Sequence, residues 1–237
     1  MTDRRFCLLT VGRAGSTSLM NELATHPDIA VPSRNVPCVD HELVHPRNVR
    51  RYMIQYSQLL GRSIATPSEL IEAFFELNQK FGYAGFKSMP DRHPDLSSFG
   101  SRTDIRFVTL TRRDIASTVA SFLVALRTGT WRRSGEAPPA SWRFVPSRDA
   151  GQATGNLSYV LESEERLRRM PDAVRLTYEE LCDPRFRSAP LEDFFGRPVH
   201  LSNPRPPTSG ESYVENWPEF REFIERSARR LTNTAGA

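Results

Sequence analysis

The chain has 237 residues, of which 38% are hydrophobic and 25% charged, a composition that excludes wholesale disorder and favours one large α/β domain. Its longest apolar runs, residues 6–11 and 122–126, are far shorter than the roughly 20 residues of a membrane-spanning helix, so no membrane span is expected. The net charge of +4 suits an anionic partner without choosing between a nucleotide, a nucleic acid and an acidic lipid. The first residues lack the apolar stretch of a signal peptide, which predicts a soluble, cytoplasmic protein.

In the first half of the chain, strand and helix patterns alternate. Residues 5–11 are mostly apolar and precede a glycine turn, which predicts a buried strand followed by a helix over 16–25. Residues 32–62 give no clear element. Thr66-Pro-Ser-Glu69 is a capping box that begins a helix extending to Phe81. Strands over 83–86 and 105–110 and a helix over 114–129 follow.

The second half continues the alternation. Residues 132–152, rich in proline, serine and arginine, predict a loop. A polar helix is expected over 157–169, a strand over 173–177, short helices near Glu179 and Leu191, and a last amphipathic helix over 216–231. The pattern predicts an α/β fold with a central parallel sheet flanked by helices, three layers in a single domain over 1–237.

The three cysteines are Cys7, Cys38 and Cys182. Their odd number and wide spacing fit neither a disulfide framework nor a zinc site, so no metal is expected.

The segment after the first strand, Gly12-Arg-Ala-Gly-Ser-Thr-Ser18, carries most of the chemistry. A strand, a glycine loop and hydroxyl residues at a helix start together bind phosphate, because backbone N–H groups and the helix dipole face the anion. The nucleotide-triphosphate loop has four residues between its glycines and then a lysine. Here two residues separate Gly12 from Gly15, no lysine follows, and the basic Arg13 lies inside the loop. These departures argue against an ordinary ATPase or GTPase.

A second motif runs from the strand at Ile105 into the next helix. Arg113 ends the strand segment and Ser121 follows eight residues later, two turns into the helix. An arginine and a hydroxyl so placed can converge on one phosphate.

The two motifs together resemble the sulfotransferases that use 3′-phosphoadenosine 5′-phosphosulfate (PAPS). The continuation Arg127-Thr-Gly-Thr-Trp131 is similar to the bacterial carbohydrate sulfotransferases of the trehalose and nodulation-factor type. The resemblance implies a P-loop-like sulfotransferase fold and a 3′-phosphate held by Arg113 and Ser121. It implies that the 5′-phosphosulfate is held by Gly12, Arg13, Ala14, Gly15, Ser16, Thr17 and Ser18.

Two shorter stretches resemble the same family. Gly85-Phe-Lys-Ser-Met-Pro90 contains Lys87, one of only two lysines in the chain, which the resemblance places at the transferring sulfuryl group. Lys87 and Arg13 would stabilise charge on the leaving phosphate. Val174-Arg-Leu-Thr-Tyr-Glu-Glu-Leu181 contains Tyr178, whose counterpart in the family packs near adenine.

The general base is less defined. Aryl and steroid sulfotransferases carry a histidine two residues after the lysine, where this chain has Met89. Glu42 and His41 occupy the segment in which glycan-modifying relatives carry a glutamate base, and His93 is a further candidate. The basic, glycine-rich loop of the family near the C-terminus has no clear counterpart. Arg205-Pro-Pro-Thr-Ser-Gly210, within the loop 203–212, lies near the expected position but lacks the Arg-Lys-Gly of the family.

The sequence therefore predicts a sulfotransferase that moves a sulfuryl group from PAPS to a hydroxyl of a small-molecule or carbohydrate acceptor, releasing adenosine 3′,5′-bisphosphate (PAP), without a metal or a nucleic acid. Two alternatives stay open at this point. One is a P-loop-type nucleotide or small-molecule kinase. The other is a basic nucleic-acid-binding module, although the basic residues are scattered rather than gathered on one face. Residues 32–62 and 132–152 are expected to line the acceptor pocket, and neither the acceptor nor the oligomeric state is predicted.

Overall fold

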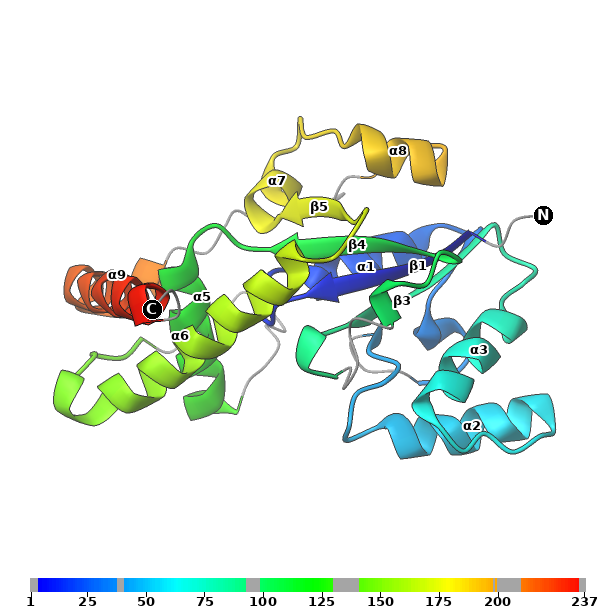
Figure 1. The fold of residues 1–237 in the computed structure, drawn as a ribbon, viewed down its shortest axis with the longest axis horizontal. Helices are drawn as coiled ribbons and strands as arrows, with labels where there is room; N and C mark the ends of the chain where they lie inside the picture. Colours follow the sequence, from blue (N-terminus) through cyan, green and yellow to red (C-terminus); the bar gives the residue numbers. More distant parts are fainter. Residues whose placement is uncertain are drawn as a thin grey trace.

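The fold is built on one five-stranded sheet in which every strand pair is parallel, in the order β2-β3-β1-β4-β5 (Figure 1). The computed structural model describes residues 4–37, 41–92, 99–129, 141–197, 199 and 210–234. The strands are β1 (Arg4–Thr10), β2 (Ile29–Ala30), β3 (Tyr83–Ser88), β4 (Ile105–Thr111) and β5 (Val174–Thr177). The predicted α/β class with a central parallel sheet is confirmed.

Helices pack on both faces of this sheet. They are α1 (Ser16–Thr25), α2 (Val49–Leu60), α3 (Pro67–Leu77), α5 (Ile115–Thr128), α6 (Pro146–Arg168), α7 (Tyr178–Cys182), α8 (Ala189–Phe195) and α9 (Trp217–Thr234). Alternate residues of β1 face opposite sides: Phe6 and Leu8 pack with α1 and α8, whereas Cys7 and Leu9 belong to the core that includes α2, α3, α5, α6 and α9. The two cores give the expected three layers.

Local sequence signals placed several elements correctly. Helix α1 has the predicted bounds, and the capping box is formed: Glu69 N–H donates to Thr66 Oγ1 at 3.2 Å, and Glu69 Oε2 accepts the Thr66 N–H at 3.2 Å. Helix α3 ends at Leu77, four residues before the predicted Phe81. Its end is marked by the buried Asn78, whose amide donates to the Phe74 carbonyl at 2.7 Å.

One expectation was wrong, and one helix was not predicted. The predicted loop over 132–152 contains the start of α6, which begins at Pro146 rather than near Leu157. Proline suits a first helical position, and Asp149 Oδ2 accepts the Val145 N–H at 2.8 Å, so the helix start is stabilised despite its polar sequence. Within residues 32–62, which gave no clear element, the structure has α2, whose buried side chains are Tyr52 and Tyr56.

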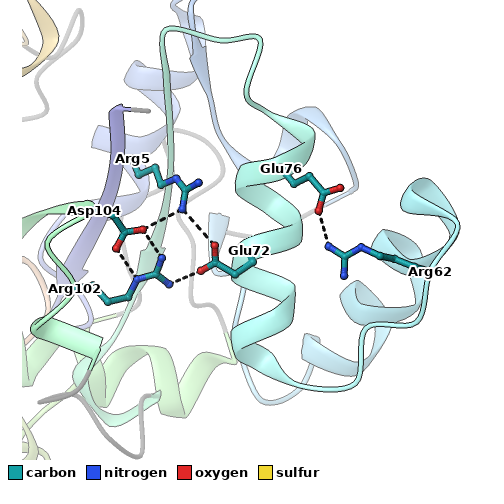
Figure 2. A network of polar contacts seen from close by, with 6 residues as sticks. All are labelled: Arg5, Arg62, Glu72, Glu76, Arg102 and Asp104. Carbon is teal, nitrogen blue, oxygen red and sulfur yellow. Dashed lines mark hydrogen bonds and ion pairs between the residues drawn. The ribbon is translucent and has the colours of Figure 1, made fainter. Parts of the chain in front are cut away.

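At the amino-terminal edge of the sheet, ion pairs connect the strands to α3 (Figure 2). Arg5 of β1 lies 3.0 Å from Asp104 and 3.3 Å from Glu72 of α3, and Arg102 pairs with the same two carboxylates. The hydrogen bond from Arg102 is the main reason that the pKa of Asp104 is lowered. Partly exposed pairs of this kind contribute about 0–1 kcal/mol each. The network therefore lies at the edge of the sheet opposite the one at which the predicted site residues lie.

Candidate functional site

The predicted site residues follow the carboxyl ends of neighbouring strands. Residues 11–15 leave β1, Lys87 is near the end of β3, and Arg112 and Arg113 follow β4. Because β1 pairs in parallel with both β3 and β4, these segments emerge at the same edge of the sheet. Open α/β sheets bind their ligands at this edge.

The loop after β1 is held close to its neighbours at two glycines. A Cβ at Gly12 would lie 2.6 Å from Cζ of Phe122, and a Cβ at Gly15 would collide with the ring of Tyr178. Gly15 has a left-handed φ of 78°, which glycine adopts at no steric cost, and Arg13 also lies in this region at 69°. The Gly15 carbonyl accepts the Ser18 N–H at 3.0 Å and so begins α1. The first N–H groups of α1 thus lie directly beside the loop.

Lys87 is buried and joins three separate parts of the chain. Its Nζ lies 3.1 Å from Oε1 of Glu42 and donates to Oγ1 of Thr17, in the first turn of α1, at 3.2 Å. Only 2% of Lys87 and 6% of Glu42 is exposed. A parallel β-bridge between Glu42 and Lys87 fixes the backbone of the Glu42 segment along the end of β3. The structure therefore brings together Lys87, Glu42 and Thr17, three of the predicted site residues.

The two histidines near Glu42 differ in their contacts. His41 has a left-handed φ of 58°, and its Nε2 lies 2.9 Å from Oδ1 of Asn21 on α1. His45, which the sequence analysis missed, places Nε2 4.0 Å from Oε2 of Glu42. Its spacing of three residues from Glu42 is the signal that could have found it. Among the described residues, Oε2 of Glu42 is buried and has no hydrogen-bond partner.

Arg13 connects the two motifs that were predicted to bind phosphate. Its Nε donates to Oγ of Ser121, on α5, at 2.9 Å, and Ser121 is buried. The described side-chain partner of Arg113 is instead Glu180, at 2.9 Å, while the Arg113 N–H donates to Oε2 of Glu179 at 3.1 Å. The Arg113 side chain is 64% exposed and thus accessible from solvent.

Tyr178 forms one wall of the loop. Its ring contacts the backbone at Gly15, and the guanidinium carbon of Arg112 lies 5.1 Å from the ring centroid. Burial is the main cause that raises the pKa of Tyr178 to about 12, so its hydroxyl stays neutral at physiological pH. Arg112, which is buried, is a second arginine at the end of β4 that the sequence analysis did not single out. Its position next to Arg113 was the available signal.

Three predictions lie wholly or partly outside the described residues: His93, residues 132–140 of the loop 132–152, and residues 203–209 of the loop 203–212. Within the described ranges, no group of three or more histidine, cysteine, aspartate or glutamate side chains could hold a metal ion. No helix of the described part of the chain is long and apolar enough to cross a membrane.

A cavity of about 470 Å³ opens at the opposite edge of the sheet. Its lining includes the first residues of β1 and β4, the side chains of Arg102 and Arg106, and Phe194 of α8. Since it faces the amino-terminal ends of the strands, this cavity is separate from the cluster around Lys87.

No protein-family model matches the chain, and no curated protein matches it in sequence. Among solved structures, the chain is similar to the sulfotransferase domain from the Synechococcus PCC 7002 olefin synthase, with 14% sequence identity and a TM-score of 0.49. The alignment covers 98% of this chain and 95% of that domain. At this identity and TM-score, the likeness does not identify the function of the chain.

Proposed function

We propose that the chain is a PAPS-dependent sulfotransferase that transfers a sulfuryl group to a hydroxyl of a small-molecule or glycan-like acceptor. The observation that carries the proposal is the contact of Lys87 with both Glu42 and Thr17 beside the glycine loop. A cation, a carboxylate and a hydroxyl from three separate segments converge next to a turn suited to an anion. This set provides a base for the acceptor and positive charge for the leaving group.

Glu42 supplies the base in this proposal. Its Oε1 pairs with Lys87, while Oε2 has no described hydrogen-bond partner and can accept a proton. Glu42 takes the proton of the acceptor hydroxyl as the acceptor oxygen bonds to sulfur. The bond between sulfur and the 5′-phosphate oxygen breaks with its electron pair on that oxygen, and PAP leaves.

Lys87 supplies charge to the same step. An ammonium group has three N–H donors, and the contacts with Glu42 and Thr17 use two of them. The third can donate to an oxygen of the transferring or leaving group. In a buried setting such a fixed charge stabilises developing negative charge more strongly than it would in water.

The surrounding residues fit the two phosphates of the donor. The start of α1 and the loop 12–15 suit the 5′-phosphosulfate, because helix N–H groups and the dipole favour an anion there. Ser121 and Arg113 are the proposed contacts of the 3′-phosphate, for which Arg113 would exchange its exposed pairing with Glu180. Tyr178, on the wall of the loop, is the proposed neighbour of the adenine.

No observation favours the kinase or nucleic-acid alternatives. A P-loop kinase needs a lysine after its second glycine, whereas Ser16 follows Gly15 here. Lys87 approaches the loop from β3 instead, where it pairs with Glu42, the proposed base.

The test is to supply PAPS with a panel of sugars, simple alcohols and phenols and to measure PAP release and sulfated product, with a chelator present. We expect product with at least one hydroxyl acceptor. Turnover of ATP with magnesium, together with no product from PAPS, would contradict the proposal.

A further inference from the structure

The contacts on which the proposed function rests hold only one of the two carboxylate oxygens of Glu42. Lys87 pairs with Oε1 at 3.1 Å, whereas the buried Oε2 has no described hydrogen-bond partner. A buried carboxylate oxygen without a donor is unfavourable, so a donor close to it is significant. Nε2 of His45, 4.0 Å away, is such a group.

The imidazole of His45 is oriented by its own turn. Nδ1 accepts the backbone N–H of Arg47 at 3.1 Å. Because a neutral imidazole carries one proton, acceptance at Nδ1 places that proton on Nε2. The ring proton of neutral His45 is therefore on Nε2, the nitrogen that faces Glu42.

The backbone of His45 is also fixed. Its carbonyl accepts the N–H groups of Asn48 and Val49, both at 2.8 Å, where α2 begins. The ring is 23% exposed, so it borders the solvent while Glu42 behind it is buried. An approach of about 1 Å would bring Nε2 within normal hydrogen-bond distance of Oε2.

We propose that His45 is a positioning residue for Glu42, a role that rests on the proposed function. Its Nε2–H donates to Oε2 while Lys87 holds Oε1, so that two donors from different segments fix the plane of the carboxylate. Each oxygen keeps a lone pair for the acceptor hydroxyl. Without His45, the carboxylate can rotate so that both oxygens pair with Lys87, which takes the base away from the acceptor.

The first test measures the tautomer of His45 in the full chain by NMR of the ring nitrogens, with the signals assigned by their loss in His45→Leu. We expect the Nε2–H tautomer, and we expect Glu42→Gln to change these signals while Glu225→Gln, on α9, leaves them unchanged. The proposal would be overturned if neutral His45 carried its proton on Nδ1, or if its ring-nitrogen signals did not change in Glu42→Gln. Either result would count whether or not the protein turns over PAPS.

The second test is kinetic. His45→Leu should lower kcat about tenfold or more, as expected for the loss of a charge-assisted hydrogen bond, and should leave the KM for PAPS and the affinity for PAP unchanged. His45→Gln, whose amide can donate to the same oxygen, should recover most of the rate. Equal losses in the leucine and glutamine variants, or an unchanged kcat in both, would overturn the positioning role alone. A wild-type chain that does not turn over PAPS would overturn the proposed function and this role with it.

Discussion

Nζ of Lys87 lies 3.1 Å from Oε1 of Glu42, and both side chains are buried at the carboxyl-terminal edge of the sheet. A buried ion pair is not in itself stabilising, because removing two charges from water can outweigh their attraction. In the proposed function, this pair belongs to the reaction site beside the loop at Gly12–Gly15.

The stability of single and double variants tests whether Lys87 and Glu42 are coupled. Lys87→Met leaves the Glu42 carboxylate buried without its cation and should lower the free energy of unfolding by about 3–5 kcal/mol. The double variant Lys87→Met/Glu42→Gln should lose less than the sum of the two single losses, as measured by urea unfolding. Additive losses would mean that the two side chains do not interact in solution.

Turnover tests the assignment of the base. Glu42→Gln keeps the size and hydrogen bonding of the side chain but cannot take a proton, so it should lower turnover by about 10²–10⁴-fold and keep the affinity for PAP. His41→Ala and His93→Ala, with the same acceptor, should stay active. If one histidine variant loses its turnover while Glu42→Gln keeps the wild-type rate, the base is that histidine. If all three stay active, the acceptor is acidic enough to need no base, as a phenol would be.

Ligand selectivity tests the site of the 3′-phosphate. Arg113→Ala and Ser121→Ala should weaken the binding of PAP by roughly 1.5–3 kcal/mol. The same variants should weaken the binding of adenosine 5′-phosphosulfate, which lacks the 3′-phosphate, much less. Arg166→Ala, an exposed arginine on α6, is the matched control. If calorimetry shows equal losses of binding free energy for both ligands, these residues do not contact the 3′-phosphate.

The pH dependence of stability tests the burial of Glu164 on α6. Burial, reinforced by repulsion from Glu179, raises the pKa of Glu164 to about 7. The folded chain therefore keeps a proton that the unfolded chain, with a glutamate pKa of about 4.3, has already lost, so stability falls as the pH rises from about 4 to 7. Glu164→Gln should remove this fall in denaturant unfolding at pH 4.5 and 7.5, whereas the exposed Glu162→Gln should retain it. An unchanged slope in Glu164→Gln would show that Glu164 titrates normally.

The elements that the sequence predicted well are those that depend on local signals. The apolar run of β1, the glycine turn and the capping box at Thr66 each act over a few residues, and the structure has them where the sequence placed them. Helix α2 was missed because its buried positions, Tyr52 and Tyr56, lie among polar and charged neighbours. The early start of α6 depends on Asp149, which pairs with Arg127 of α5, a contact that no local pattern encodes.

The residues of the candidate site were predicted individually, but their pairing was not. Glu42 and Lys87 are 45 positions apart, and their contact depends on the path of the Glu42 segment beside β3. Likewise, Arg13 was expected at the 5′-phosphosulfate and Ser121 at the 3′-phosphate, whereas the two side chains hydrogen-bond to each other. Such contacts follow from strand order, which the sequence pattern does not determine.

The most direct test of the central claim compares two nucleotides in one thermal-unfolding measurement. PAP should raise the melting temperature, because a ligand at one hundred times its Kd stabilises the folded state by about 2.7 kcal/mol. ATP with magnesium, at the same concentration, should raise it much less, since the loop lacks the lysine of a nucleotide-triphosphate site. Equal or greater stabilisation by ATP with magnesium would contradict the sulfotransferase assignment and favour a kinase.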